Sequence, residues 1–209
     1  MPEHIRALIV ILFLSFIVFF IAKRTACQII PIEDYNRRRN LWFVITALAF
    51  LAHNFWIYVL ISSVIILFSI KKENHPIALF FILIFAFPTN SVPIPGIGLA
   101  NFLFSLSHQR LLILIILLPI FFNLLDSKSN IPFGAILPDK LIGLFIALVI
   151  LLNFRGTSLT DVLRSTLYQF MDVFLPYFVI SRSLKSISDF RHVLLAFTLG
   201  NVNGNDRCI

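Results

Sequence analysis

Charge is scarce in this 209-residue chain. Asp, Glu, Lys and Arg make up 13% of it, whereas about a quarter is usual in a soluble domain. Hydrophobic residues fill 59% of the sequence, and the mean hydropathy is +0.95. These values exclude an ordinary soluble domain and predict an integral membrane protein surrounded by the lipid bilayer.

Cysteine and recognisable catalytic motifs are also scarce. Cys27 and Cys208 share no spacing with each other or with a histidine that would indicate a metal site, and they do not form a disulfide framework. No HExxH, Ser-His-Asp or paired-carboxylate spacing is present. The histidines are scattered along the chain, at His4, His53, His75, His108 and His192. We therefore expect no metal site and no cofactor.

Two further patterns are missing. The apolar runs are continuous and rich in Leu, Ile and Phe, without the alternation of barrel strands, so all spanning segments should be helical. No repeat of fixed period relates two halves, as it does in many secondary transporters. The net charge of +7 comes from basic residues beside apolar runs, as in cytoplasmic anchors, so no nucleic-acid partner is expected.

The apolar runs predict an all-α fold, a polytopic transmembrane helical bundle of about six to eight membrane segments, several short or broken. The first run, Ile5–Ala22, is as long as a span, and no cleavage site follows it. Leu41–Ile70 would be roughly 45 Å long as one helix, so we expect a bend or hairpin at His53-Asn54. The other expected segments are Ile77–Phe87, Leu99–Leu106, Leu111–Leu125, interrupted by Pro119, and Leu141–Phe154.

Charges beside these runs predict the orientation. The loop 23–40 carries Lys23, Arg24 and Arg37–Arg39, so the positive-inside rule places it in the cytoplasm and the N-terminus outside. On the other side, Pro88–Gly98 holds three prolines and two glycines in eleven residues, so it cannot be helix or strand throughout. It is either an external loop or a re-entrant segment that lines protein or water.

Between residues 156 and 199 the charges follow a pattern. On a helix, Asp161, Arg164, Tyr168 and Asp172 fall within roughly 80° of one another. This polar stripe has two interpretations. In one, the helix lies along the bilayer interface with its charges toward water. In the other, the stripe faces a wet cavity within a bundle, where charges at membrane depth are usually functional.

The stripe also yields candidate site residues. The helix should end near Leu175, because Pro176 lacks an N–H and disfavours a helical residue before it. In a cavity, Arg164 would reach Asp161, whereas Asp172 would need a partner from another segment, with the arginines at 155 and 182 nearest in sequence. The candidate substrate-binding residues are therefore Arg155, Arg164, Asp172 and Arg182.

The C-terminal composition changes abruptly. Phe190–Leu199 begins like another span but has about half the length that a crossing needs. Residues 200–209 are polar and without pattern. We therefore expect residues 1–199 to form a single transmembrane helical domain, as a fragment of a longer protein, and residues 200–209 to be a non-native tail. Such a break predicts a truncated or frameshifted product.

Two stretches resemble bacterial O-antigen ligase-like proteins, an inner-membrane group that includes O-antigen polymerases and O-glycosylation ligases. One runs from LPDKLIGLF at residue 137 to HVLLAF at residue 197, and its most specific part is DVFLPYFVISRSL, residues 172–184. The other is Ile94–Pro119. The likeness covers Leu41–Leu199 and corresponds to the N-terminal half of those proteins.

This resemblance implies a location in the bacterial inner membrane and transfer or polymerisation of polyprenyl-pyrophosphate-linked glycans at the periplasmic face, without a metal. Cations would hold the pyrophosphate, and a base would orient the acceptor hydroxyl. The family carries an essential Arg and His on a large periplasmic loop in its second half, so we expect this chain to be inactive alone. A secondary transporter and a non-catalytic membrane subunit remain alternatives.

Overall fold

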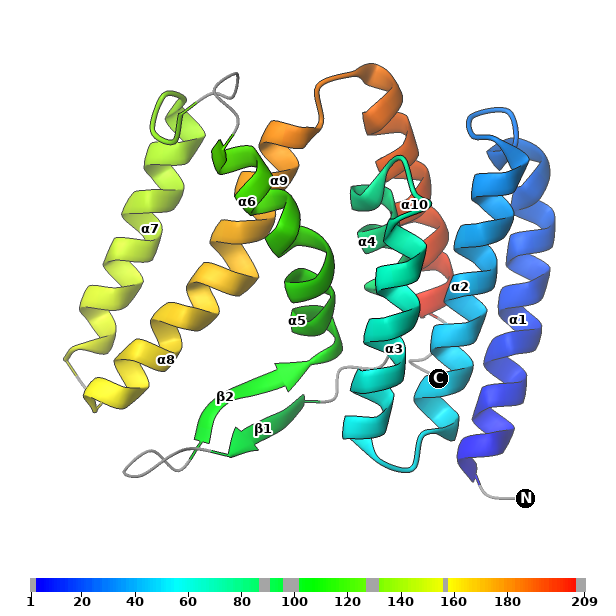
Figure 1. The fold of residues 1–209 in the computed structure, drawn as a ribbon, viewed down its shortest axis with the longest axis horizontal. Helices are drawn as coiled ribbons and strands as arrows, with labels where there is room; N and C mark the ends of the chain where they lie inside the picture. The colour runs from blue at the N-terminus through cyan, green and yellow to red at the C-terminus, as the bar shows by residue number, and fades with distance from the viewer. Residues whose placement is uncertain (1–2, 87–90, 96–101, 127–131, 156–157, 206–209) are drawn as a thin grey trace. The chain divides into compact units, whose positions relative to one another are not determined.

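The computed structural model describes residues 3–86, 91–95, 102–126, 132–155 and 158–205, and it is mostly helical (Figure 1). The chain divides into two compact units. Unit 1 combines Met1–Asn90 with Leu184–Ile209, and unit 2 is Ser91–Ser183. The expected helical fold is confirmed.

Unit 1 is a set of long neighbouring helices joined by short turns. Its elements are α1 (Glu3–Ala26), α2 (Ile32–Leu51), α3 (Phe55–Ile70), α4 (Pro76–Leu83) and α10 (Ile187–Asn205). Helix α2 packs against α1, α3 and α4, and α10 packs against α4 and α1. Aromatic rings fill the α1–α2 contact, where Phe19 lies 5.6 Å from Trp42 between ring centroids.

The break expected at His53-Asn54 is confirmed, because α2 ends at Leu51 and α3 begins at Phe55. The Asn54 side chain accepts a hydrogen bond of 2.9 Å from the backbone N–H of Trp56, which satisfies a donor at the start of α3. Chain direction therefore reverses at each turn. As a result the end of α1, the start of α2, the α3–α4 turn and the start of α10 gather at one end of unit 1 (Figure 1).

Helix α10 differs from the expectation for the C-terminus, because it continues through residue 200 to Asn205. Gly200 lies so close to α4 that a Cβ placed there would be 2.8 Å from the Phe85 ring and 3.2 Å from the Phe81 carbonyl oxygen. The segment expected to be a tail thus begins inside a packed helix. Sequence composition missed this because Gly and Asn are poor helix formers on their own.

Unit 2 begins with a two-stranded antiparallel sheet of β1 (Ser91–Pro95) and β2 (Phe102–Ser107). Val92 pairs with Leu106, and the register shifts between Pro93 and Pro95. The expectation of a membrane segment at Leu99–Leu106 is therefore wrong from residue 102 onward. Residues 87–90 and 96–101 of the proline-rich region lie outside the described residues.

The rest of unit 2 is helical. The first run consists of α5 (His108–Leu112), a π-helical turn η1 (Ile113–Leu117) and α6 (Leu118–Asp126). Helix α7 (Leu137–Asn153) confirms that most of the predicted segment Leu141–Phe154 is helical. The last run consists of α8 (Leu159–Gln169), a second π-helical turn η2 (Phe170–Phe174) and α9 (Leu175–Ser183), which packs against α6.

Proline does not end either long run, so the predicted helix end near Leu175 is wrong, as is the predicted interruption at Pro119. Each proline is preceded by a π turn, in which the N–H of Leu118 bonds the carbonyl of Ile113 and the N–H of Leu175 bonds that of Phe170. The wider turn relieves the clash between the proline ring and the preceding turn of helix. The rule that proline ends a helix applies to a regular α-helix and does not take account of a preceding π turn.

Within the described residues, two helices are long and apolar enough to cross a membrane, Ile5–Ala26 and His108–Asp126. The first extends the run predicted at Ile5–Ala22, and the second contains the run predicted at Leu111–Leu125. Phe55–Ile70 is apolar but shorter. The expected number of membrane segments, about six to eight, exceeds these two helices and stays a prediction.

Candidate functional site

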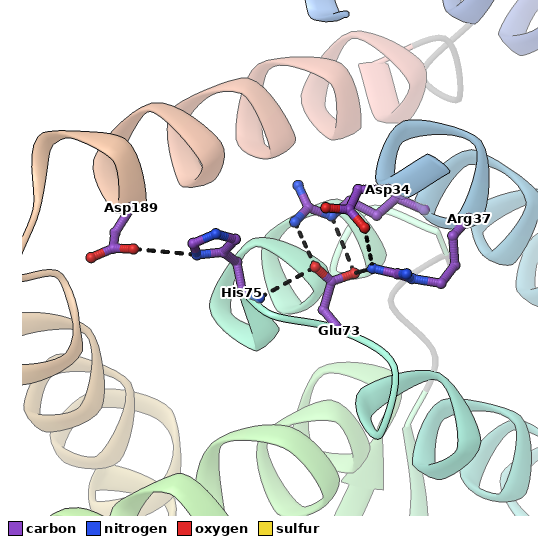
Figure 2. Close-up of polar contacts among 6 residues, drawn as sticks. Asp34, Arg37, Glu73, His75 and Asp189 are labelled. Atoms are coloured by element: carbon purple, nitrogen blue, oxygen red, sulfur yellow. Dashed lines mark hydrogen bonds and ion pairs between the residues drawn. The ribbon is translucent and has the colours of Figure 1, made fainter. Parts of the chain in front are cut away.

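The densest group of polar side chains lies in unit 1, where α2, the α3–α4 turn and the start of α10 meet (Figure 2). We call it the basic-end cluster, since it lies where the lysines and arginines of unit 1 gather. Its members are Asp34, Arg37, Arg38, Glu73, His75, Asp189 and His192.

Glu73 is the centre of this cluster. One carboxylate oxygen accepts from Arg38 Nη2 at 2.6 Å, and the other accepts from Arg37 Nη2 at 2.8 Å. The side chain of Glu73 is fully buried and that of Arg38 is 2% exposed. Arg37 also bonds Asp34 at 2.7 Å, and the backbone N–H of His75 donates to Glu73 at 3.3 Å. One carboxylate thereby ties α2 to the α3–α4 turn.

The electrostatics of Glu73 follow from these partners. Burial by itself raises the pKa of the Glu73 carboxyl, but the hydrogen bonds and positive charges of Arg38 and Arg37 outweigh burial. The pKa of Glu73 therefore lies below its ordinary value, and the carboxylate is ionised at neutral pH. A charged Glu73 is what keeps the buried guanidinium of Arg38 compensated.

The histidines form the other half of the cluster. His75 Nδ1 lies 3.2 Å from Asp189 Oδ1, and the rings of His75 and His192 stack with centroids 4.1 Å apart. Asp189 is fixed by a reciprocal capping box with Ser186, with bonds of 3.0 and 3.1 Å. His75 therefore joins the α3–α4 turn to the start of α10 through both Asp189 and His192.

Some polar atoms of the basic-end cluster are unused. Arg37 Nε, Arg38 Nη1 and His192 Nδ1 are buried and have no hydrogen-bond partner in the described part of the chain. Buried polar groups are nearly always satisfied in folded proteins, so these atoms are candidates for contact with a bound molecule or water. The cluster thus has unused hydrogen-bonding capacity beside two histidines.

In unit 2, Asp172 pairs with Arg110, which corrects the expectation that Arg155 or Arg182 would be its partner. Arg110 Nη2 lies 2.7 Å from Asp172 Oδ2, and Nη1 donates to the Ser105 carbonyl at 2.6 Å. The guanidinium also lies 3.9 Å above the Tyr168 ring. The partner does come from another segment, as expected. It was missed because Arg110 begins a helix far away in sequence.

Arg182 pairs with Asp139 instead. Its Nη2 lies 2.7 Å from Asp139 Oδ2, and Asp139 also accepts from the Tyr177 hydroxyl at 2.7 Å and from the Gly134 N–H at 2.9 Å. Asp139 is fully buried and Arg182 is 5% exposed. This group joins the start of α7 to α9 and has the bonding pattern of a structural clamp.

The remaining candidates lie at the α7–α8 corner. Arg164 Nη1 lies 2.8 Å from Asp161 Oδ1, the partner expected one turn earlier, and Asp161 is half exposed. Arg155 is exposed just after α7. A bond of 2.7 Å from Asn153 to Ser165 joins the two helices there. The candidates therefore do not share one set of contacts, because Asp172 and Arg182 each belong to a separate ion pair.

The basic-end cluster was missed by the sequence analysis, which interpreted Arg37 and Arg38 only as cytoplasmic anchors. One local signal was available, because Asp34 precedes Arg37 and Arg38 at helical spacing. Glu73 and His75 became members through packing between distant segments, which a single sequence does not show.

In the described ranges, no group of three or more His, Cys, Asp or Glu side chains could hold a metal ion. The chain matches no protein-family model, no curated protein and no solved structure.

Proposed function

We propose that this chain is a multi-pass inner-membrane protein of the O-antigen ligase-like kind, a part of the machinery that transfers or polymerises polyprenyl-pyrophosphate-linked glycans at the periplasmic face, and that it is inactive alone. The proposal rests on the resemblance of residues 172–184 and 94–119. It is supported by one structural observation. The segment with the most specific resemblance, at η2 and α9, supplies one partner to two of the three arginine–carboxylate pairs in the described part of unit 2.

The surface of the helices supports a membrane location. Helix α3 exposes Leu60, Leu67 and Phe68, and α7 exposes Leu144 and Leu151, each by half or more of its surface. Exposed apolar faces of this extent mark contact with lipid or a partner. Together with the spanning length of Ile5–Ala26, they support helices that lie in a bilayer.

The four candidate residues then divide by role. Asp172 and Arg182 hold the helices of unit 2 together, since their charges are matched by Arg110 and Asp139. A pyrophosphate needs cations that can turn toward it. Arg155 is exposed, and the partner of Arg164 is a half-exposed carboxylate, so in this proposal these two arginines contact the pyrophosphate.

Binding of a short polyprenyl pyrophosphate tests this proposal. The purified chain in neutral detergent is titrated with geranylgeranyl pyrophosphate and, as a control for the apolar tail, with geranylgeraniol. The double variant Arg155→Gln/Arg164→Gln should bind the pyrophosphate at least about tenfold more weakly. The matched charge change Lys71→Gln/Lys72→Gln should leave affinity unchanged. Equal affinity for the alcohol and the pyrophosphate would contradict the proposal.

The orientation is tested separately. The proposal places the basic end of unit 1, including loop 23–40, in the cytoplasm. A single cysteine is introduced at Asn36 in a chain carrying Cys27→Ser and Cys208→Ser. An impermeant thiol reagent should label it in inverted membrane vesicles and not in intact spheroplasts. Labelling in spheroplasts would reverse the orientation.

The stacked histidines favour a second candidate, a proton-coupled secondary transporter. Chains of His and acidic residues carry protons in such proteins, and Asp189, His75 and His192 form a chain of this kind. Proteoliposomes with an imposed pH gradient test it. Faster decay of the gradient with the natural chain than with His75→Gln would favour transport, and equal decay would remove this candidate.

A further inference from the structure

An apolar groove of about 450 Å³ runs along the outside of unit 1 where α1 and α2 meet. Leu12 and Phe16 of α1 line it, together with Phe43, Val44 and Ala47 of α2. The groove lies within the part of α1 that is long and apolar enough to span a membrane. Its volume is within the range of ligand pockets, about 300–1,000 Å³, and its lining suits a hydrocarbon chain.

Two cations lie at the basic end of this groove. Phe19 of α1 and Phe43 of α2 touch across the seam, with ring centroids 5.6 Å apart. Lys23 follows Phe19 by one helical turn, and Arg39 precedes Phe43 by one turn in the antiparallel helix. Because residues four apart share a face of a helix, Lys23 on α1 and Arg39 on α2 each lie one turn beyond this ring contact, on the face that contributes to it.

The position of Arg39 is fixed by its neighbours. Its Nε and Nη2 donate to the Asn40 side chain at 3.2 and 2.9 Å. One turn before Arg39, the Tyr35 hydroxyl bonds the Phe19 carbonyl of α1, so this stretch of α2 lies against α1. The exposed Asn40 amide therefore lies beside the Arg39 guanidinium.

The charge at the seam is uncompensated. Neither Lys23 nor Arg39 takes part in an ion pair among the described residues. The buried acid nearby, Asp34, is already paired with Arg37. Along α1, at 1.5 Å per residue, Lys23 lies about 10 Å from Phe16, the nearest lining residue of the groove on that helix. Two cations without ion-pair partners at this end of an apolar groove are complementary to an anionic headgroup above an acyl chain.

We propose that the α1–α2 seam binds one anionic glycerophospholipid of the cytoplasmic leaflet. Its phosphate contacts Lys23, Arg39 and the Asn40 amide, and one acyl chain lies in the groove between Phe16 and Val44. The site needs both parts, because the cations supply the charge preference and the groove supplies the hydrocarbon contact. A lipid held there would brace the first two helices of the chain.

Binding to two lipids with the same acyl chains tests the headgroup contact. The full chain in neutral detergent is titrated with dioleoylphosphatidylglycerol or dioleoylphosphatidylcholine, and binding is read by native mass spectrometry. Phosphatidylglycerol should bind more tightly. In Lys23→Gln/Arg39→Gln its affinity should fall by about tenfold or more, since each cation near a lipid surface contributes appreciably. The double variant Lys71→Gln/Lys72→Gln, with the same loss of charge at the same end of unit 1, should keep it.

A second variant tests the groove with both cations intact. Ala47→Phe fills the groove and should reduce the affinity for phosphatidylglycerol, whereas Val64→Phe fills a different apolar groove on α3 and should not. Glycerol 3-phosphate, the headgroup chemistry without acyl chains, should not compete. Equal affinity for both lipids, full competition by glycerol 3-phosphate, or unchanged binding in Lys23→Gln/Arg39→Gln and Ala47→Phe would each overturn the proposal.

Discussion

The two units bury charge in different ways. In unit 2, Asp139 accepts three hydrogen bonds and Arg110 is held by Asp172, Ser105 and the Tyr168 ring, so each buried charge has its partners. In unit 1, Glu73 serves two arginines while buried nitrogens of Arg37, Arg38 and His192 stay unused. The saturated pairs have the pattern of structural clamps, and the unsaturated cluster has the pattern of a site.

The units also pack their helices differently. Unit 2 uses aromatic rings, because Phe121 of α6 lies 5.1 Å from Phe178 and 6.0 Å from Phe170 between ring centroids. Unit 1 also uses aromatic rings, at the α1–α2 contact, but in addition it brings backbones together where Gly200 contacts α4. A ring cluster tolerates small adjustments of side chains, whereas a glycine contact leaves no space for a methyl group. The two units should therefore respond to different substitutions.

Glu73→Ala should have the largest effect on stability. The change leaves the buried Arg38 and the half-buried Arg37 without their shared carboxylate, which should cost about 3–5 kcal/mol. Glu33→Ala removes an exposed acid of α2, the helix that carries Arg37 and Arg38, and should change stability by about 0.5 kcal/mol or less. Thermal unfolding of both variants in one detergent measures this. A small and similar loss of stability in Glu73→Ala and Glu33→Ala would show that water reaches the basic-end cluster.

Gly200→Ala should be next. The added methyl group would meet the Phe85 ring at 2.8 Å and the Phe81 carbonyl at 3.2 Å, so α10 must move away from α4 at a cost of about 1–3 kcal/mol. Gly143→Ala in unit 2 meets nothing closer than 3.8 Å and removes a glycine from a helix, so it should be neutral or stabilising. Comparison of the two unfolding midpoints decides. A tolerated alanine at 200 would place that residue outside the fold.

Asp172→Ala should have a smaller effect than Glu73→Ala. It strands Arg110, but Asp172 is 30% exposed and Arg110 keeps its bonds to Ser105, so we expect a loss of about 1–2 kcal/mol. Asp161→Ala removes a half-exposed partner of Arg164 and should cost about 0–1 kcal/mol. The same unfolding assay ranks the two variants. Equal losses would mean that the whole stripe faces water.

The smallest effect is on pH dependence. Because the pKa of Glu73 is lower in the folded chain than in the unfolded chain, its contribution to stability is complete above the unfolded value and is lost as pH falls through the folded value. The unfolding midpoint of the natural chain should therefore drop between about pH 5 and pH 3. Glu73→Gln should drop less over that range, since it has no carboxyl to protonate. If the unfolding midpoints of the natural chain and of Glu73→Gln fell equally with pH, Glu73 would not be the group responsible for the loss of stability.

Much of the helical fold could be predicted from single segments. The first apolar run, the break at His53-Asn54 and helix α7 follow from local periodicity and capping, which act between residues a few positions apart. The strand at residues 102–107 could not be predicted in this way. It is as apolar as a membrane helix, and it is a strand because it pairs with β1.

The candidate site was harder to predict for the same reason. Arg164 and Asp161 are one turn apart, so their contact follows from helix geometry. The pairs of Asp172 with Arg110 and of Arg182 with Asp139 join residues 62 and 43 positions apart. Helical spacing carries no information about such pairs. Only the packed arrangement of each unit decides which charges meet.

The two π turns change the direction in which the side chains after them point. Each inserts one residue relative to an α-helix, which rotates everything after it by about 100° about the helix axis. A helical wheel drawn through 156–183 therefore assigns the residues after Phe174 to the wrong side. Because α6 and α9 both follow such an insertion, their offsets match, and Phe121 and Phe178 face each other. Deletion of one residue from either turn would rotate one ring away and leave the other without its partner.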